Sequence, residues 1–144
     1  MSNPDPAATL LAIEQIKQLK ARYFRLMDTK QWEAWGGVFA DDVVMDVPEA
    51  DMVVTGRAEV VAFVSGALGT ARTAHHGHMP EIELTGPDTA RGVWAMFDSV
   101  DWERPDGTHG GLTGFGHYTD DYRHGPDGWQ IARTRLDRLR VDYT

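Results

Sequence analysis

The sequence predicts an α+β fold, a cone-shaped α+β barrel in which a strongly curved, mixed but mostly antiparallel sheet wraps around three N-terminal helices. Two observations support this prediction. In the first half of the 144-residue chain the apolar residues have mostly helical spacing, whereas the second half consists of β-like segments separated by turn sequences. Long strands joined by short turns bend into a curved sheet, whose hollow side can hold helices and a pocket. With no repeat or linker, residues 1–144 are expected to form one domain.

Three segments are expected to be helical. The first runs from about Ala8 to Met27, and its apolar stripe consists of Ile13, Ile16, Leu19, Tyr23 and Met27, with Glu14, Lys17, Lys20 and Arg25 off the stripe. The second is a short helix suggested by Trp32, Trp35 and Phe39. The third spans about 57–68 and is closed by a glycine at 69. Two prolines near the N-terminus make residues 1–7 a loose N-terminal arm.

The remaining segments are β-like. Two short strands are expected at 43–47 and 52–55, and four long ones at 75–85, 89–102, 111–123 and 128–142. Turn sequences separate the long strands, namely Gly86-Pro87-Asp88, Pro105-Asp106-Gly107 and Gly125-Pro126-Asp127-Gly128.

Composition and charge exclude several classes of protein. The absence of cysteine rules out a disulfide framework, a thiolate nucleophile and an iron–sulfur cluster. With 22 acidic and 14 basic residues the net charge is −8, which disfavours nucleic acid and anionic membranes as partners. The N-terminus lacks the features of a signal peptide, and no apolar run reaches the roughly 18 residues of a membrane span. We therefore expect a soluble, cytoplasmic protein without a nucleic-acid or membrane partner.

Strand alternation places some polar side chains on an apolar face. In segment 89–102 the even positions are the more apolar, so Asp98 is expected on the buried face beside Trp94 and Met96, unless a bulge leaves it outside. In segment 75–85 the glutamates at 81 and 83 are expected to face water, which places His76 and His78 inside. Two inward imidazoles can move protons near neutral pH, although they can equally be core histidines bonded to neighbouring groups.

Asp28 and Tyr23 lie near the end of the first helix. The negative end of the helix dipole is expected to raise the pKa of Asp28, although Asp28 can also simply cap the second helix. Five residues separate the two side chains, so both reach a pocket only if the helix unwinds at Asp28. In the last strand, Arg133 or Arg135 is expected to reach the pocket, while the arginines at 138 and 140 are expected on a solvated edge.

A metal or nucleotide cofactor is not expected. His76 and His78 could be metal ligands with Asp98 or His117 as a third, but no specific ligand spacing is present. The sequence also contains neither a phosphate-binding glycine loop nor the glycine-flanked elbow of a serine nucleophile.

The chain as a whole resembles the nuclear transport factor 2-like superfamily, and within it the SnoaL-like branch, from about Leu10 to Val141. The order of elements carries this likeness together with Ile16 to Tyr23, Asp28-Thr29-Lys30-Gln31-Trp32, Val38-Phe39-Ala40-Asp41-Asp42, His75-His76-Gly77-His78-Met79-Pro80-Glu81 and Gly128-Trp129-Gln130-Ile131. The superfamily includes dehydratases, dehydrohalogenases, isomerases, polyketide cyclases, epoxide hydrolases and proteins that only bind.

The resemblance implies a catalytic set. In cofactor-free lyases such as scytalone dehydratase and bile-acid 7α-dehydratase, an aspartate at the end of the first helix works with a histidine on the first long strand, and Asp28 and His76 match these places. Asp28 would accept the Nδ1 proton of His76, whose Nε2 would remove a substrate proton. Tyr23 matches a helix tyrosine of the dehydratases, and it or His78 would polarise the substrate. Asp98 could imitate a carboxyl group of ketosteroid isomerase.

The predicted function is that of a cofactor-independent lyase or isomerase, dehydratase-like, acting on a small hydrophobic molecule such as a polyketide or steroid. Trp94, Met96 and Phe115 would form the apolar walls, and His78, Asp98 and Arg135 would bind substrate. The alternative is a non-catalytic module for small-molecule binding or dimerisation. The other face of segment 89–102 carries Val93, Ala95 and Phe97, so we expect a homodimer or, as a second possibility, a trimer.

Overall fold

A computed structural model describes residues 4–144, which form three α-helices, a short 3-10 helix and six strands. Their order is α1 (Pro6–Asp28), α2 (Trp32–Gly36), β1 (Phe39–Val47), η1 (Pro48–Ala50), β2 (Met52–Thr55), α3 (Arg57–Leu68), β3 (Arg72–Gly86), β4 (Thr89–Glu103), β5 (His109–Gly125) and β6 (Gly128–Tyr143). The predicted helices and strands are thus all present. The second helix is shorter than expected, and most of the strands extend beyond the predicted ends.

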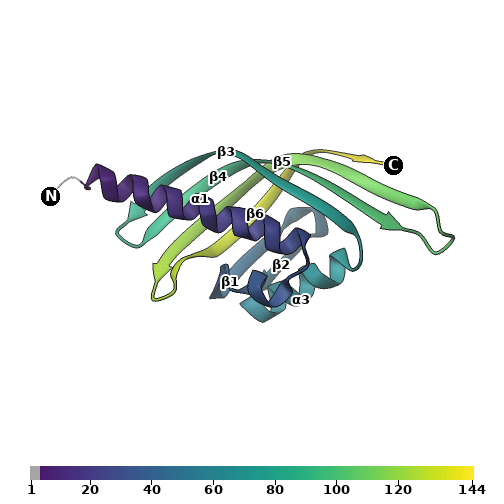
Figure 1. Ribbon diagram of the computed structural model, residues 1–144, viewed down its shortest axis with the longest axis horizontal. Helices are drawn as coiled ribbons and strands as arrows, with labels where there is room; N and C mark the ends of the chain where they lie inside the picture. The colour runs from purple at the N-terminus through teal and green to yellow at the C-terminus, as the bar shows by residue number, and fades with distance from the viewer. Residues whose placement is uncertain (1–3) are drawn as a thin grey trace.

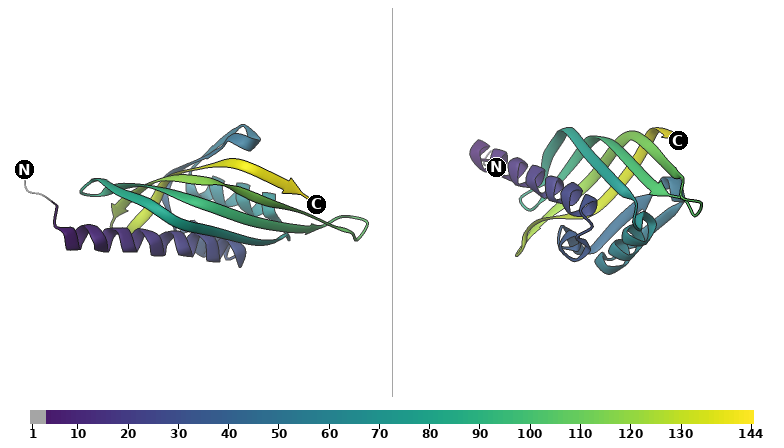
Figure 2. Two further views of the ribbon diagram at one scale, coloured as in Figure 1. Left: turned by 90° about the horizontal axis from the view of Figure 1, so that it is seen from above. Right: turned by 45° about the vertical axis from the view of Figure 1, so that its right-hand side comes forward.

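The six strands form one mixed sheet in the order β2-β1-β6-β5-β4-β3. The β1–β6 pair is parallel and the other pairs are antiparallel. The sheet is strongly curved and open, with β2 and β3 at its edges, and the helices lie on one side of it (Figures 1 and 2). This arrangement confirms the predicted α+β cone.

Helix α1 begins earlier than the sequence suggested, so the expectation of a loose arm over residues 1–7 is wrong for its last residues. Pro6 occupies the first turn, where its missing N–H costs no helical hydrogen bond, and the Asp5 carboxylate caps the helix by accepting from the Ala7 N–H at 3.1 Å. Residues 1–3 lie outside the described part of the chain.

The core lies between α1 and the concave face of the sheet. Aromatic rings from four elements meet there, because Tyr23 of α1 packs against Trp35 of α2, Phe39 of β1 and Tyr118 of β5 with ring centroids 5.6 to 6.0 Å apart. The predicted α1 stripe is largely confirmed, since Ile16, Leu19, Tyr23 and Met27 are buried. Lys20 is also fully buried, contrary to its expected place off the stripe.

Bulges in β3 and β6 determine which side chains face the core. In β3, Met79 and Pro80 together oppose a single residue of β4 between the His78–Ala95 and Glu81–Val93 pairs. An extra residue reverses the alternation of the strand. Beyond the bulge the even positions face inward as predicted, but before it the odd positions do. The prediction that His76 and His78 face inward is therefore wrong, and His75 faces inward instead.

The same effect occurs in β6, where the register shifts between Ile131 and Arg133. Trp129 and Ile131 are buried before this bulge, whereas Thr134 is buried after it. The inward set of β6 therefore changes from odd to even positions as far as Arg138, and a second register shift follows between Arg138 and Arg140.

Among residues 4–144, no helix combines the length and apolar character needed to cross a membrane.

Candidate functional site

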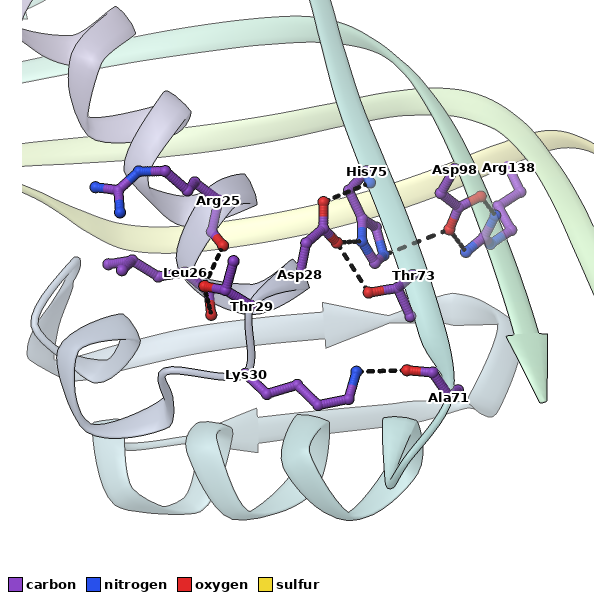
Figure 3. Close-up of polar contacts among 10 residues, drawn as sticks. All are labelled: Arg25, Leu26, Asp28, Thr29, Lys30, Ala71, Thr73, His75, Asp98 and Arg138. Atoms are coloured by element: carbon purple, nitrogen blue, oxygen red, sulfur yellow. Dashed lines mark hydrogen bonds and ion pairs between the residues drawn. The ribbon is translucent and has the colours of Figure 1, made fainter. Parts of the chain in front are cut away.

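The centre of the site is a dyad of Asp28, the last residue of α1, and His75 on β3 (Figure 3). Asp28 Oδ1 lies 2.6 Å from His75 Nδ1, and Asp28 Oδ2 accepts the backbone N–H of His75 at 2.9 Å. The Thr73 hydroxyl donates to Oδ1 at 2.9 Å. Because an ionised carboxylate only accepts hydrogen bonds, Nδ1 carries the proton and Nε2 is left free.

The pKa of Asp28 is lowered, contrary to the expectation from the helix dipole. Burial opposes ionisation, but hydrogen bonds from the His75 side chain and backbone, the charge of His75 and the Thr73 hydroxyl together outweigh it. The possible role of Asp28 as a cap of α2 is also not realised, since no side chain caps that helix.

A second acidic group lies on the other side of the imidazole. Asp98 of β4 is 1% exposed, which confirms its predicted burial, and its Oδ2 is 3.7 Å from His75 Nε2. Arg138 of β6 forms a two-fold ion pair with Asp98, with both N–O distances 2.8 Å. The Nε of Arg138 lies 3.0 Å from a Glu49 carboxylate oxygen but makes no aligned hydrogen bond. His75 thus lies between Asp28 and an Asp98 that is already paired.

Two buried tyrosines complete the polar part of the site. Tyr23 is 3% exposed and Tyr118 is 4% exposed. Burial is the main cause that raises the pKa of each phenol well above its usual value, and the carboxylates of Asp98 and Asp120 add to the effect. Both hydroxyls therefore stay protonated at neutral pH and remain hydrogen-bond donors.

These groups border a cavity of about 160 Å³. Tyr23, His75, Tyr118, Thr134 and Arg138 line it together with the carboxylate residues Asp46 and Glu49. The rest of the wall is apolar and consists of Met27, Met45, Val47, Phe63, Val64, Ala67, Leu68 and Leu136. Tyr23 reaches the cavity directly, whereas Asp28 reaches it through His75, so α1 need not unwind before Asp28.

Several predicted site residues lie elsewhere. His76 and His78 are exposed on the outer face, with parallel rings 6.3 Å apart, and Phe115 packs on the same face against Phe97. Arg135 pairs with Asp46 and Asp137 instead of lining the cavity. Trp94 and Met96 are buried on the inner face but do not line the cavity, and the Trp94 indole donates to the Tyr122 hydroxyl at 2.9 Å.

The metal ligands considered in the sequence analysis do not lie together in one cluster. His76, His78 and His117 are exposed on the outer face of the sheet, whereas Asp98 lies on the inner face, so Asp98 cannot share an ion with the histidines. Across residues 4–144 no group of three or more His, Asp or Glu side chains has the arrangement of a metal site.

The sequence analysis missed His75, Arg138, Tyr118 and the buried pair of Lys20 and Asp120 (Nζ to Oδ2, 2.7 Å). One signal for His75 was present, because a proline inside a strand is typical of a bulge or an edge, and Pro80 follows His75 by five residues. No comparable signal marks the β6 bulge, so the inward position of Arg138 could not be inferred in this way.

The fold and site together define a class of small proteins in which a curved sheet encloses a pocket with a carboxylate–histidine dyad. Comparison with protein families gives the particular assignment: residues 8–135 match the SnoaL-like domain, and the chain belongs to this family.

Individual relatives agree with this family. Probable cyclase FGR4 of Gibberella zeae is 27% identical over 135 residues, which cover 86% of this chain and 89% of the relative. A protein of Novosphingobium aromaticivorans, provisionally assigned as a scytalone dehydratase, superposes with a TM-score of 0.80 and 20% identity over 92% of this chain and 87% of its own. The hexachlorocyclohexane dehydrochlorinase LinA-type3 of Novosphingobium barchaimii superposes with a TM-score of 0.79 and 15% identity over 94% and 91% of the two chains. The two structural likenesses establish the fold alone.

Proposed function

We propose that this protein is a cofactor-independent lyase or isomerase of the dehydratase type, in which His75 has the role that the sequence suggested for His76. The observation that carries the proposal is the 2.6 Å contact between Asp28 Oδ1 and His75 Nδ1. It fixes the imidazole tautomer in which Nε2 can accept a proton, the orienting function that a carboxylate has in hydrolase triads.

The first step would be removal of a proton from the carbon next to a substrate carbonyl. The C–H bond breaks, the proton goes to His75 Nε2, and the electron pair of the bond moves toward the carbonyl oxygen to form an enolate. Tyr23 and Tyr118 would donate hydrogen bonds to that oxygen, because their raised pKa values keep them protonated. Loss of a leaving hydroxyl from the neighbouring carbon, protonated by Nε2–H, would complete a dehydration.

Asp98 fits this step as a stabiliser of the imidazolium. Its carboxylate lies 3.7 Å from Nε2, so it attracts the positive charge that develops when Nε2 takes a proton. Its ion pair with Arg138 balances the buried negative charge when His75 is neutral. Both oxygens of Asp98 accept hydrogen bonds from the guanidinium group of Arg138.

The cavity supports a small, mostly apolar substrate. Its walls are aliphatic and aromatic, and its polar groups include His75, the tyrosines and Arg138. The name of the Gibberella zeae relative supports a cyclase as one form of the reaction. A cyclase would use the same enolate, whose carbon would attack a second carbonyl of the same molecule. The π electrons of that carbonyl would move to its oxygen, and the resulting alkoxide would take the proton from His75 Nε2–H to give a hydroxyl group.

The test is turnover of a panel of enolisable β-hydroxy ketones and poly-β-ketones, with deuterium uptake at the α-carbon followed by NMR in D2O. We expect His75→Gln to slow exchange and turnover by about 100-fold or more, the usual contribution of a general base. His76→Gln is the matched control, and we expect it to stay within twofold of wild type. Full activity of His75→Gln would contradict the proposal. Binding of the ketones without exchange by the wild type would favour the non-catalytic alternative.

A further inference from the structure

A charged pair is buried directly behind the tyrosines of the cavity. Lys20 Nζ lies 2.7 Å from Asp120 Oδ2, and both side chains are 0% exposed. Asp120 also accepts the hydroxyls of Tyr122 at 2.8 Å and Thr134 at 2.7 Å. The carboxylate is therefore held by three donors. The mechanism proposed above uses neither Lys20 nor Asp120.

A contribution to folding stability does not by itself explain why this ion pair is buried. Removing two charges from water costs several kcal/mol per ion, and apolar side chains of similar volume often serve a fold as well or better. Burial accordingly lowers the pKa of Lys20, although Asp120 opposes the shift. A role connected with the cavity explains the pair better, because it touches three residues of the cavity wall, namely Tyr23, Tyr118 and Thr134.

The contact with the tyrosines is made through their ring faces. Lys20 Nζ lies 4.1 Å from the ring centroid of Tyr23 and 3.8 Å from that of Tyr118. An ammonium group at this distance is attracted by the electrons of an aromatic ring, and the attraction is stronger when the group is desolvated. The attraction grows when the ring becomes more electron-rich. A phenol becomes more electron-rich as it donates its proton into a strong hydrogen bond.

We propose that Lys20 is a positioning residue that strengthens the Tyr23 and Tyr118 hydroxyls as donors to a substrate oxygen acquiring negative charge. This inference rests on the proposed function, since it deepens the role of the two phenols. The stabilisation is larger for an enolate than for the parent ketone, because only the enolate draws the phenol protons strongly. An interaction that increases along the reaction in this way lowers the barrier instead of merely tightening substrate binding. Asp120 serves to hold the ammonium between the two rings.

The test uses 4-nitrophenol, whose anion is coloured and whose charge lies on a phenolic oxygen like that of an enolate. The double variant Lys20→Met with Asp120→Asn removes both charges together, so that neither ion remains buried without its partner. We expect wild type to prefer the 4-nitrophenolate anion over the neutral phenol, seen as a lowered pKa of the bound probe in an absorbance titration. The preference of the double variant for the anion should be about tenfold smaller than that of wild type. Its affinity for neutral 4-nitroanisole should stay within about twofold of the wild-type value.

Lys17→Met is the matched control. It removes the same charge from the same helix, but Lys17 is 46% exposed and pairs with Glu14 at the surface. We expect the anion preference of this variant to equal that of wild type. The inference is overturned if wild type does not prefer the anion, or if the double variant retains the full preference.

A second measurement covers the case in which the double variant does not fold. In wild-type protein the Lys20 Cε resonance should shift when 4-nitrophenolate binds and should not respond to 4-nitroanisole. An equal response to both ligands, or none to the anion, would overturn the inference. Neither experiment requires turnover, so a failure of Lys20 in this role and a failure of His75 as a base are separate results.

Discussion

His75 and His76 are adjacent in the chain and have opposite environments. The imidazole of His75 is 7% exposed and bonds to Asp28, whereas His76 is exposed beside His78 on the outer face. The two residues have the same intrinsic acidity and differ only in the side of the strand they occupy. The chemistry of the dyad therefore depends on strand orientation, which residue type alone does not encode.

Asp28→Asn is expected to destabilise the protein by about 1–3 kcal/mol at neutral pH, because the carboxylate accepts three hydrogen bonds that an amide cannot all replace. Since the pKa of Asp28 is lowered in the folded state, its contribution is complete above the unfolded value of about 3.9 and is lost as the pH falls through the folded value. Urea unfolding of both proteins should thus show a smaller difference at pH 3 than at pH 7. An equal difference at both pH values would contradict this.

Gly114 allows Asp98 and Arg138 to meet. A Cβ atom at position 114 would overlap the Arg138 guanidinium and the Asp98 carboxylate. We expect Gly114→Ala to separate the pair and to cost about 1–3 kcal/mol in urea unfolding, with a loss of turnover. Gly66→Ala on α3 is the control, because nothing lies within 4 Å of its Cβ position, and we expect it to be neutral or stabilising by up to about 1 kcal/mol. Similar values for both variants would refute this explanation.

At the scale of elements, the strands were predicted well but the faces of two of them were not. Periodicity locates a strand because every residue in it contributes to the pattern. One extra residue leaves that pattern of residue types almost intact. It nevertheless moves every side chain beyond the bulge to the opposite face of the sheet. Asp98 was placed correctly because β4 pairs with β5 without a bulge from Thr89 to Glu103. The histidines of β3 and the arginines of β6 were misplaced because their strands contain bulges.

Deletion of Met79 tests the role of the β3 bulge. Without the extra residue His75 and Ile82 are six positions apart, so a regular strand presents both side chains to the core. We expect the deletion variant to keep turnover far above that of His75→Gln. Met79→Ala is the control, since the Met79 side chain is 92% exposed, and its stability should change by no more than about 0.5 kcal/mol. A deletion variant with turnover as low as that of His75→Gln would contradict this explanation of how the bulge orients His75.

Helix α1 shows a second reason why prediction from the sequence failed, which is the burial of a charged side chain. Lys20 follows Ile16 by four residues and precedes Tyr23 by three, so its position belongs to the buried stripe. A lysine is expected at the surface unless a partner is known, and that partner, Asp120, lies 100 residues away in the chain. Only the packed sheet brings the two together.

At the scale of the whole molecule, the outer face of the sheet remains a predicted interface. Phe97 and Phe115 pack with ring centroids 5.3 Å apart on this face, among partly exposed Val93 and Ala95. We expect a homodimer through this face, or a trimer as the second possibility, because oligomers commonly cover such surfaces. Light scattering at micromolar concentration should give at least twice the monomer mass, and Phe97→Glu should reduce it. A monomeric mass for wild type would contradict the prediction.

The sequence by itself determined the fold class, the order of the elements, the family and the burial of Asp98, because each depends on a pattern repeated over many residues. The tertiary structure decided that His75 rather than His76 meets Asp28, that Arg138 rather than Arg135 borders the cavity, and that Lys20 lies behind the tyrosines. The physical reason is that each of these contacts joins single atoms from segments that lie far apart in the chain. Strand register and a single bulge residue determine which atoms meet, and neither can be inferred from the local pattern of apolar and polar residues.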